Sequence, residues 1–93
     1  MIVRKADRYL VEGPMTFATA AALLAEGDAM EGSDIIVDLA GVTAADSSAL
    51  SLLMEWTRRS RNGGRRIAYA NLGPNLRNLA GMYGVIDLLP CAS

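Results

Sequence analysis

Apolar residues along this chain follow two spacings, one typical of strands and the other typical of helices. Four short β-prone runs are bounded by glycine, proline or charged residues and predict strands. The expected strands are 2–5, 8–12, 34–39 and 65–71. Apolar residues at three- and four-residue spacing predict three helices between and after these runs. The helices are expected between Thr16 and Gly27, from Ser47 to about Arg61, and from Pro74 to Gly84. This order predicts an α/β fold with some parallel strand pairing, as a single domain over residues 1–93.

Glycine, proline and short polar segments predict several of the element boundaries. Gly13-Pro14 is expected to end the second strand, and a short connector is expected between Leu39 and Asp46. The nearly continuous apolar run at 34–39 suggests a strand buried on both faces. Residues 85–89 fit either a last short strand or a helical turn.

Each expected helix has one apolar face that should contact the core. These positions are Phe17, Ala20, Ala21 and Leu24 in the first helix, Ala49, Leu50, Leu53, Trp56 and Thr57 in the second, and Leu76, Leu79, Ala80 and Tyr83 in the third. Leu52 falls instead among polar positions of the second helix, beside Ser48 and Ser51. We therefore expect Leu52 to be exposed and to serve as an anchor for a partner helix.

Composition narrows the class of protein. Hydrophobic residues make up 52% of the chain, which favours a packed domain over disorder, and the net charge of −1 gives no reason to expect nucleic acid or an anionic membrane as a partner. The single cysteine, Cys91, cannot form an internal disulfide, which fits a reducing compartment. No apolar run approaches the ~20 residues needed to cross a bilayer, and charges near the N-terminus argue against a secretory signal. We expect a cytoplasmic protein that reaches a membrane only through a partner.

The residues that most catalytic devices need are missing from the sequence. Histidine is absent and the one cysteine lies near the C-terminus, which excludes Ser-His-Asp and Cys-His devices and the usual zinc sites. Phosphate-binding glycine motifs are absent as well. Asp38 and Asp46 could form a carboxylate pair, but a strand-end turn and a helix cap are simpler roles for them. We expect a protein that is not an enzyme and has no cofactor or metal.

Five arginines follow one another closely near the end of the second helix. They are Arg58, Arg59, Arg61, Arg65 and Arg66. A solvated helix end is favoured by the negative end of the helix dipole, and a docking role remains the alternative. Because no aromatic residues are interleaved with them, nucleic-acid binding is not expected.

The start of the second helix is the strongest candidate site. Asp46-Ser47-Ser48 follows an apolar strand and opens an apolar-periodic segment. Asp and Ser are common N-cap residues, so capping alone accounts for their presence. The positive end of the helix dipole also suits an anion, including a phosphate on a serine hydroxyl. Both a cap and a contact or regulatory role stay open from spacing alone.

This region resembles the signature of STAS domains, named for sulphate transporters and anti-sigma factor antagonists. The segment VDLAGVTAADSSALSLLMEW, the helix stop before Gly64 and the segment LRNLAGMYGVIDLLP look particularly like the small STAS subunit of the Mla phospholipid transport system. The resemblance implies a mixed sheet with helices packed mainly on one face. It also implies that Ser47 is a contact residue, supported by Asp46 and Ser48.

The resemblance leaves more than one function open. The leading hypothesis is a non-catalytic subunit that binds the cytoplasmic ATPase of an Mla-type ABC complex at the inner membrane. The resemblance implies that this complex maintains the lipid asymmetry of the outer membrane. The alternative is an anti-sigma factor antagonist, in which a partner kinase phosphorylates the residue that matches Ser47. Those antagonists commonly have glycine where this chain has Ala49, and alanine would crowd a kinase at the first helical turn. A third class is a domain that binds a lipid or small ligand on its own.

Overall fold

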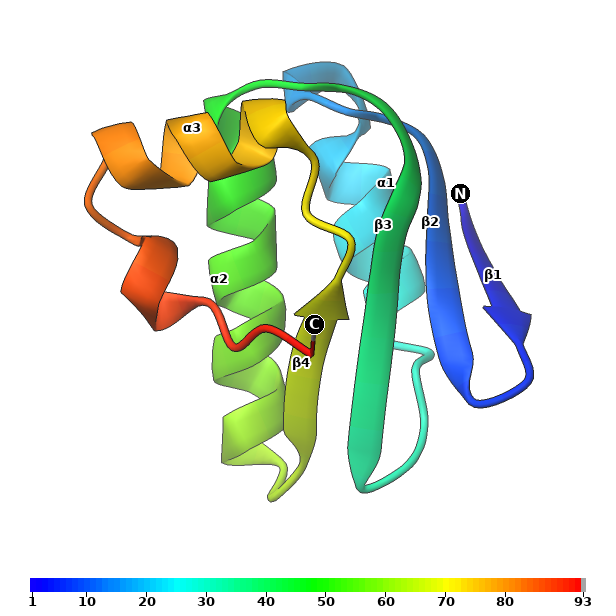
Figure 1. Ribbon diagram of the computed structural model, residues 1–93. Coiled ribbons are helices and arrows are strands. Elements are labelled where there is room, and N and C mark those ends of the chain that lie inside the picture. The colour runs from blue at the N-terminus through cyan, green and yellow to red at the C-terminus, as the bar shows by residue number, and fades with distance from the viewer. Residues whose placement is uncertain (93) are drawn as a thin grey trace.

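The computed structural model describes residues 1–92 and contains four strands, three α-helices and one 3-10 turn (Figure 1). The elements are β1 (Ile2–Lys5), β2 (Arg8–Met15), α1 (Phe17–Gly27), β3 (Asp34–Ala45), α2 (Ser47–Asn62), β4 (Arg66–Ala70), α3 (Pro74–Met82) and the 3-10 turn η1 (Ile86–Leu88). The expected order of strands and helices is confirmed. The turn at η1 resolves the alternatives left for residues 85–89 in favour of a helical turn.

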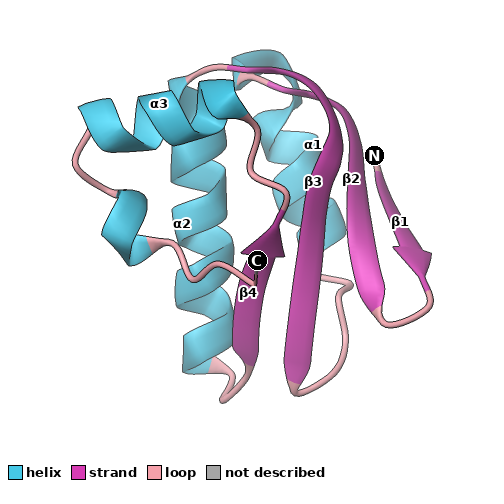
Figure 2. Ribbon diagram, viewed as in Figure 1, coloured by secondary structure: helices cyan, strands magenta, loops and turns pink. Residues whose placement is uncertain are grey.

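The strands form one mixed sheet in the order β1-β2-β3-β4 (Figure 2). β1 and β2 form an antiparallel hairpin, whereas β2 pairs with β3, and β3 with β4, in parallel. The parallel pairs are each connected through a helix, as the alternation of elements requires. The carboxyl ends of β2 and β3 therefore lie at the same end of the sheet.

α1 and α2 lie side by side on one face of the sheet, and α3 crosses near the end where α2 begins (Figure 1). Their apolar faces meet the inward side chains of the strands in a single core, in which Val37, Leu53 and Trp56 are fully enclosed. The implied arrangement of helices mainly on one face of a mixed sheet is confirmed. Since the other face carries no helix, Ile36 is only half-buried and the expectation of full burial on both faces of 34–39 is wrong for that side chain.

Two strands are longer than expected. β2 does not end at Gly13-Pro14 but continues to Met15. The strand passes this point with a φ of +90° at Gly13 and a shift of register against β3. β3 likewise continues through the expected connector as far as Ala45. Pairing with β2 holds this segment extended although its own sequence lacks a strand pattern.

The helix boundaries agree closely with expectation. On α1 and α3, however, the buried residues differ from those expected on the core face. All five core positions expected on α2 are buried. On α1, however, Leu23 and Gly27 are buried while Phe17 is 85% exposed, so the helix is rotated relative to the expected face. Tyr83 lies just beyond the end of α3 and is 61% exposed. Tyr83 caps α3, and Gly84 after it has a φ of +69°, typical of a helix end, so Tyr83 is not part of the buried helical face.

Candidate functional site

The first turn of α2 is held in place by Asp46. One carboxylate oxygen, Oδ1, accepts a hydrogen bond from the backbone N–H of Ser48 at 2.8 Å, and the other, Oδ2, accepts one from the backbone N–H of Phe17 at 3.1 Å. The N–H of Asp46 itself donates to the carbonyl oxygen of Met15 at 3.3 Å. The expected capping role of Asp46 is confirmed, and the same side chain also ties the start of α1 to the start of α2.

These contacts fix the charge of Asp46. The hydrogen bond from the Phe17 N–H, together with those from Ser48, lowers the pKa of the Asp46 carboxyl below its ordinary value, against a smaller opposing effect of desolvation. Asp46 is therefore a carboxylate at neutral pH. It keeps a negative charge beside Ser47 at the positive end of the α2 dipole.

Ser47 is the first residue of α2 and is exposed, whereas Ser48 is half-buried. Ser47 borders a shallow groove of about 380 Å³ between α2 and the segment that follows α3. The residues that line this groove are Ser47, Ser48, Leu50, Ser51, Met54, Tyr83 and Val85. Ser47 thus lies at the rim of a hollow lined by both apolar side chains and serines.

Two exposed residues of this groove were not expected there: Met54 was not singled out from the sequence, and Tyr83 was expected in the core. Met54 is 37% exposed and shares a face of α2 with Ser47 and Ser51, three positions related by i, i+4 and i+7. Tyr83 comes from the end of α3 and borders the same groove. The helical spacing could have revealed Met54, but the position of Tyr83 depends on how α3 packs. We refer to Ser47, Ser51, Met54 and Tyr83 as the Ser47 surface.

Leu52 does not belong to this surface. It is only 4% exposed, so the expectation that it is an exposed anchor for a partner is wrong. α2 contacts the sheet with one side and α1 with a second side, and Leu52 lies on the second side, where Ala20 and Leu24 of α1 border the same groove. A single expected core face was therefore too narrow for a helix that has neighbours on two sides.

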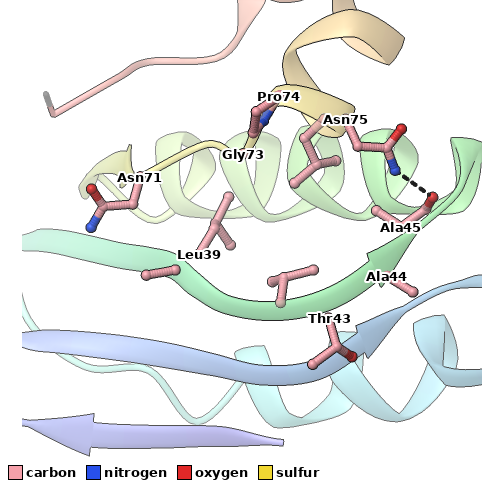
Figure 3. A pocket seen from close by; sticks show the side chains of 11 residues that line it. Leu39, Thr43, Ala44, Ala45, Asn71, Gly73, Pro74 and Asn75 are labelled. Atoms are coloured by element: carbon pink, nitrogen blue, oxygen red, sulfur yellow. Dashed lines mark hydrogen bonds between the residues drawn. The ribbon is translucent and has the colours of Figure 1, made fainter.

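A further groove, of about 210 Å³, lies between the end of β3 and the start of α3 (Figure 3). At its edge the side-chain Nδ2 of Asn75 donates a hydrogen bond to the carbonyl oxygen of Ala45 at 3.1 Å. Ala45 immediately precedes Asp46, so this bond attaches α3 to the strand end that carries the site. Through it the third helix helps to position the start of the second.

Asp38 lies apart from Asp46, within β3 rather than at a strand end, and the two do not form a carboxylate pair. Its Oδ1 accepts hydrogen bonds from the Ala40 N–H at 2.9 Å and from Nδ2 of Asn71 at 3.0 Å. Its Oδ2 pairs with Nη1 of Arg8 at 3.1 Å. The bond from Asn71, followed by those from Ala40 and Arg8, lowers the pKa of Asp38 despite its burial. Asp38 thus joins β2, β3 and the turn after β4.

The arginines near the end of α2 mostly pair within the chain. Arg58 and Arg59 both pair with Glu55, and their hydrogen bonds lower the pKa of Glu55 to about 2. Arg59 also reaches Asp28 at 2.8 Å. Arg65 donates to the carbonyl oxygen of Met30 at 2.6 Å, and Arg66 lies 3.9 Å from Asp34. This geometry favours the solvated helix end over the docking alternative.

None of the helices in residues 1–92 is both long enough and apolar enough to cross a membrane.

The sequence matches the model of one known protein family. The family model described as "Mlab, STAS domain" matches residues 4–90. No curated protein matches the sequence significantly.

Several solved structures share the fold. A sulfate transporter family protein from Wolinella succinogenes has 21% identity and a TM-score of 0.72 over 89% of this chain and 70% of that one. The anti-sigma factor antagonist SpoIIAA in its unphosphorylated form has 15% identity and a TM-score of 0.72, with 100% and 87% covered. SpoIIAA of Bacillus in its phosphorylated form has 15% identity and a TM-score of 0.69, with 100% and 90% covered. At these identities the likeness concerns the fold alone.

Proposed function

This chain belongs to the STAS domain family, and on that premise we propose that it is a non-catalytic subunit that binds and supports the ATPase of an Mla-type ABC phospholipid transport complex. It would work at the cytoplasmic side of the inner membrane, attached through that partner. The description of the matching family model, which includes the word Mlab, supports this branch of the family.

The observation that carries the proposal is the exposed Ser47 hydroxyl at the rim of a groove that combines serines with the exposed side chains of Met54 and Tyr83. A protein interface commonly combines apolar residues that lose water with a few polar groups that fix orientation. Met54 and Tyr83 are exposed apolar residues of this kind, and Ser47 supplies a hydroxyl that can donate or accept a hydrogen bond. Asp46 and Ser48 support Ser47 by fixing the first turn of α2.

A binding role also agrees with the chemistry of the site. A hydroxyl needs a neighbouring base to become a nucleophile, and the chain contains no histidine. Asp46 is committed to two backbone N–H groups of its own chain. These observations support a protein that acts by holding its partner and not by catalysing a reaction.

The alternative function is that of an anti-sigma factor antagonist switched by phosphorylation of Ser47. One specific observation favours it: structures of SpoIIAA in both the unphosphorylated and the phosphorylated form share this fold. The exposure of Ser47 would permit modification. Two features count against phosphorylation of Ser47. The methyl group of Ala49 would crowd a kinase at the first turn of α2. The negative charge of Asp46 would repel a phosphate on Ser47 beside it.

Copurification tests the proposal directly. The tagged protein is expressed from its own locus and isolated from membranes dissolved in mild detergent, and its partners are identified by mass spectrometry. We expect an ABC-type ATPase in stoichiometric amounts from the wild type and a marked loss of it from Ser47→Arg. Ser33→Arg is the matched control, because Ser33 is an exposed serine in the loop before β3.

Two results would contradict the proposal. Recovery of a kinase-like anti-sigma factor in place of an ATPase would favour the alternative function. Equal recovery of the ATPase with wild type and Ser47→Arg would mean that the ATPase binds elsewhere on the domain.

A further inference from the structure

A groove of about 180 Å³ lies at the end of α2 opposite Ser47, where α1 and α2 both end beside the start of β3 (Figure 1). We refer to it as the Trp56 groove, after the indole in its wall. Two guanidinium groups, those of Arg59 and Arg65, line it together with a single carboxylate, that of Asp28. The groove therefore carries an excess of positive charge in a chain whose net charge is −1.

The indole N–H of Trp56 has no hydrogen-bond partner. Trp56 is 2% exposed, and residues 1–92 supply no acceptor for its buried Nε1. This nitrogen lies against Gly27, where even an added methyl group would overlap it, and Gly27 also lines the groove. A buried donor without an acceptor costs free energy. Its position at the wall of a groove indicates an acceptor that comes from outside the chain.

Arg65 is a cation that no carboxylate neutralises. Its Nη1 donates to the carbonyl oxygen of Met30 at 2.6 Å, but its guanidinium takes part in none of the ion pairs within residues 1–92. Arg59, in contrast, is paired with Asp28 and with a glutamate of its own helix. Ser60 is only 8% exposed and brings a hydroxyl to the same groove. The groups left to bind a ligand are therefore mainly donors.

The two helix ends at this groove are capped. The carboxyl end of a helix repels anions because its last carbonyl groups lack N–H partners. At the end of α2, the carbonyl oxygens of residues 59–61 accept hydrogen bonds from the N–H groups of residues 63–65. At the end of α1, those of residues 25–27 accept from residues 28–30. These bonds reduce the repulsion that an anion would meet here.

We propose that the Trp56 groove binds a phosphate group, held by the guanidinium of Arg65, the hydroxyl of Ser60 and the indole N–H of Trp56. A tetrahedral phosphate accepts hydrogen bonds from several directions, whereas the two oxygens of a carboxylate lie in one plane. The indole nitrogen has no surface open to water, so the ligand reaches it only after a neighbouring side chain shifts. Arg65 can make this shift, because it is exposed and one carbonyl oxygen holds its guanidinium. The site does not depend on the function proposed for Ser47.

The single tryptophan makes the test direct. A ¹⁵N–¹H NMR spectrum of the labelled protein contains one indole N–H signal, which belongs to Trp56 and moves downfield when the N–H gains an acceptor. Titration with sodium phosphate at constant ionic strength should shift this signal to saturation, with a dissociation constant of about 1 mM. Sodium chloride alone should not shift it. A parallel titration with glycerol 3-phosphate shows whether a phosphate ester or the free anion binds more tightly.

Two neighbouring arginines provide the variant and its control. Arg65→Gln should weaken phosphate binding by about tenfold or more, because it removes the charged donor. Arg66→Gln removes the same charge from the next residue, whose side chain is 90% exposed and lies outside the groove, and should bind like the wild type. Circular dichroism should show both variants folded.

Two results would overturn the proposal. The first is an indole signal that about 20 mM phosphate shifts no further than chloride does. The second is equal affinity of Arg65→Gln and Arg66→Gln for phosphate.

Discussion

The carboxylate of Asp46 accepts a hydrogen bond from the backbone N–H of Phe17, 3.1 Å away and 29 positions earlier in the chain. A residue that looks like a simple cap of α2 therefore also caps α1. Both helices begin at the same end of the sheet, where the parallel strands β2 and β3 finish. The position of Ser47 depends on this shared anchor.

Replacing Asp46 tests its double role. Asp46→Ala removes the acceptor for two backbone N–H groups and should lower the melting temperature by about 4–8 °C, while Asp46→Asn should lower it less because one amide oxygen remains. Differential scanning calorimetry at neutral pH measures both. If Asp46→Ala melts like the wild type, the bond to Phe17 contributes nothing to stability.

Gly27 is expected to tolerate no side chain. A methyl group on its Cα would overlap the indole of Trp56, which is fully enclosed in the core. Gly27→Ala should therefore destabilise the fold by about 1–3 kcal/mol, measured by urea denaturation. Gly81→Ala is the control: it lies within α3 with no atom near the added methyl group, and it should be neutral or slightly stabilising. Equal stabilities of the two variants would contradict the close contact.

Leu52 and Met54 should respond in opposite ways although they are two residues apart. Leu52→Ala empties a buried position between α1 and α2 and should cost about 2–5 kcal/mol of folding free energy. Met54→Ala should change the folding free energy by less than about 0.5 kcal/mol and should weaken partner binding. Denaturation and binding assays on both variants separate these effects. Loss of binding by a fully stable Leu52→Ala would mean that Leu52 contacts the partner after all.

Asp38 should make stability depend on acidic pH. Its pKa is lowered in the folded protein, chiefly by Asn71 and then by Ala40 and Arg8, so the unfolded chain takes up its proton first. The contribution of Asp38 is thus complete above the ordinary value of about 3.9 and is lost as the pH falls through the lower, folded pKa. Asn71→Gly keeps the positive φ of 58° and removes the amide, so it should raise the pKa of Asp38. An unchanged NMR titration of the Asp38 carboxyl in this variant would contradict the assignment.

The sequence predicts those features that depend on local chemistry. The α2 boundaries follow from Asp46 at its start and the glycines after Asn62, and its five core positions follow from helical spacing. The site at Asp46 and Ser47 could be found for the same reason, since a cap is a local arrangement. The expectation of an α/β fold follows from the order of the elements.

What could not be predicted depends on contacts between distant segments. Leu52 is buried because α1 packs on a second side of α2, and β3 extends to Ala45 because β2 lies beside it. Tyr83 joins the Ser47 surface because the segment after α3 lies beside α2. The bond from Asp46 to Phe17 likewise connects residues that no spacing rule relates.

Ser47→Ala distinguishes a contact from a switch. If Ser47 donates or accepts one hydrogen bond at the interface, Ser47→Ala should weaken binding to the ATPase by about 0.5–1.5 kcal/mol, and Ser47→Thr, which keeps the hydroxyl, should bind normally. A phosphorylation switch instead predicts that Ser47→Ala binds its partner fully and no longer responds to a kinase. Mass spectrometry of the native protein for phosphate on Ser47 completes the comparison.

Isothermal titration calorimetry with the purified ATPase subunit that copurifies with this protein tests the central claim most directly. The account predicts a one-to-one complex with the wild type and with Ser33→Arg. For Ser47→Arg it predicts affinity reduced by at least about a hundredfold, because a bulky charge would have to lose its water at the interface. Melting curves should show both variants folded. Affinities that are the same for Ser47→Arg and Ser33→Arg, or no binding by the wild type, would contradict the account.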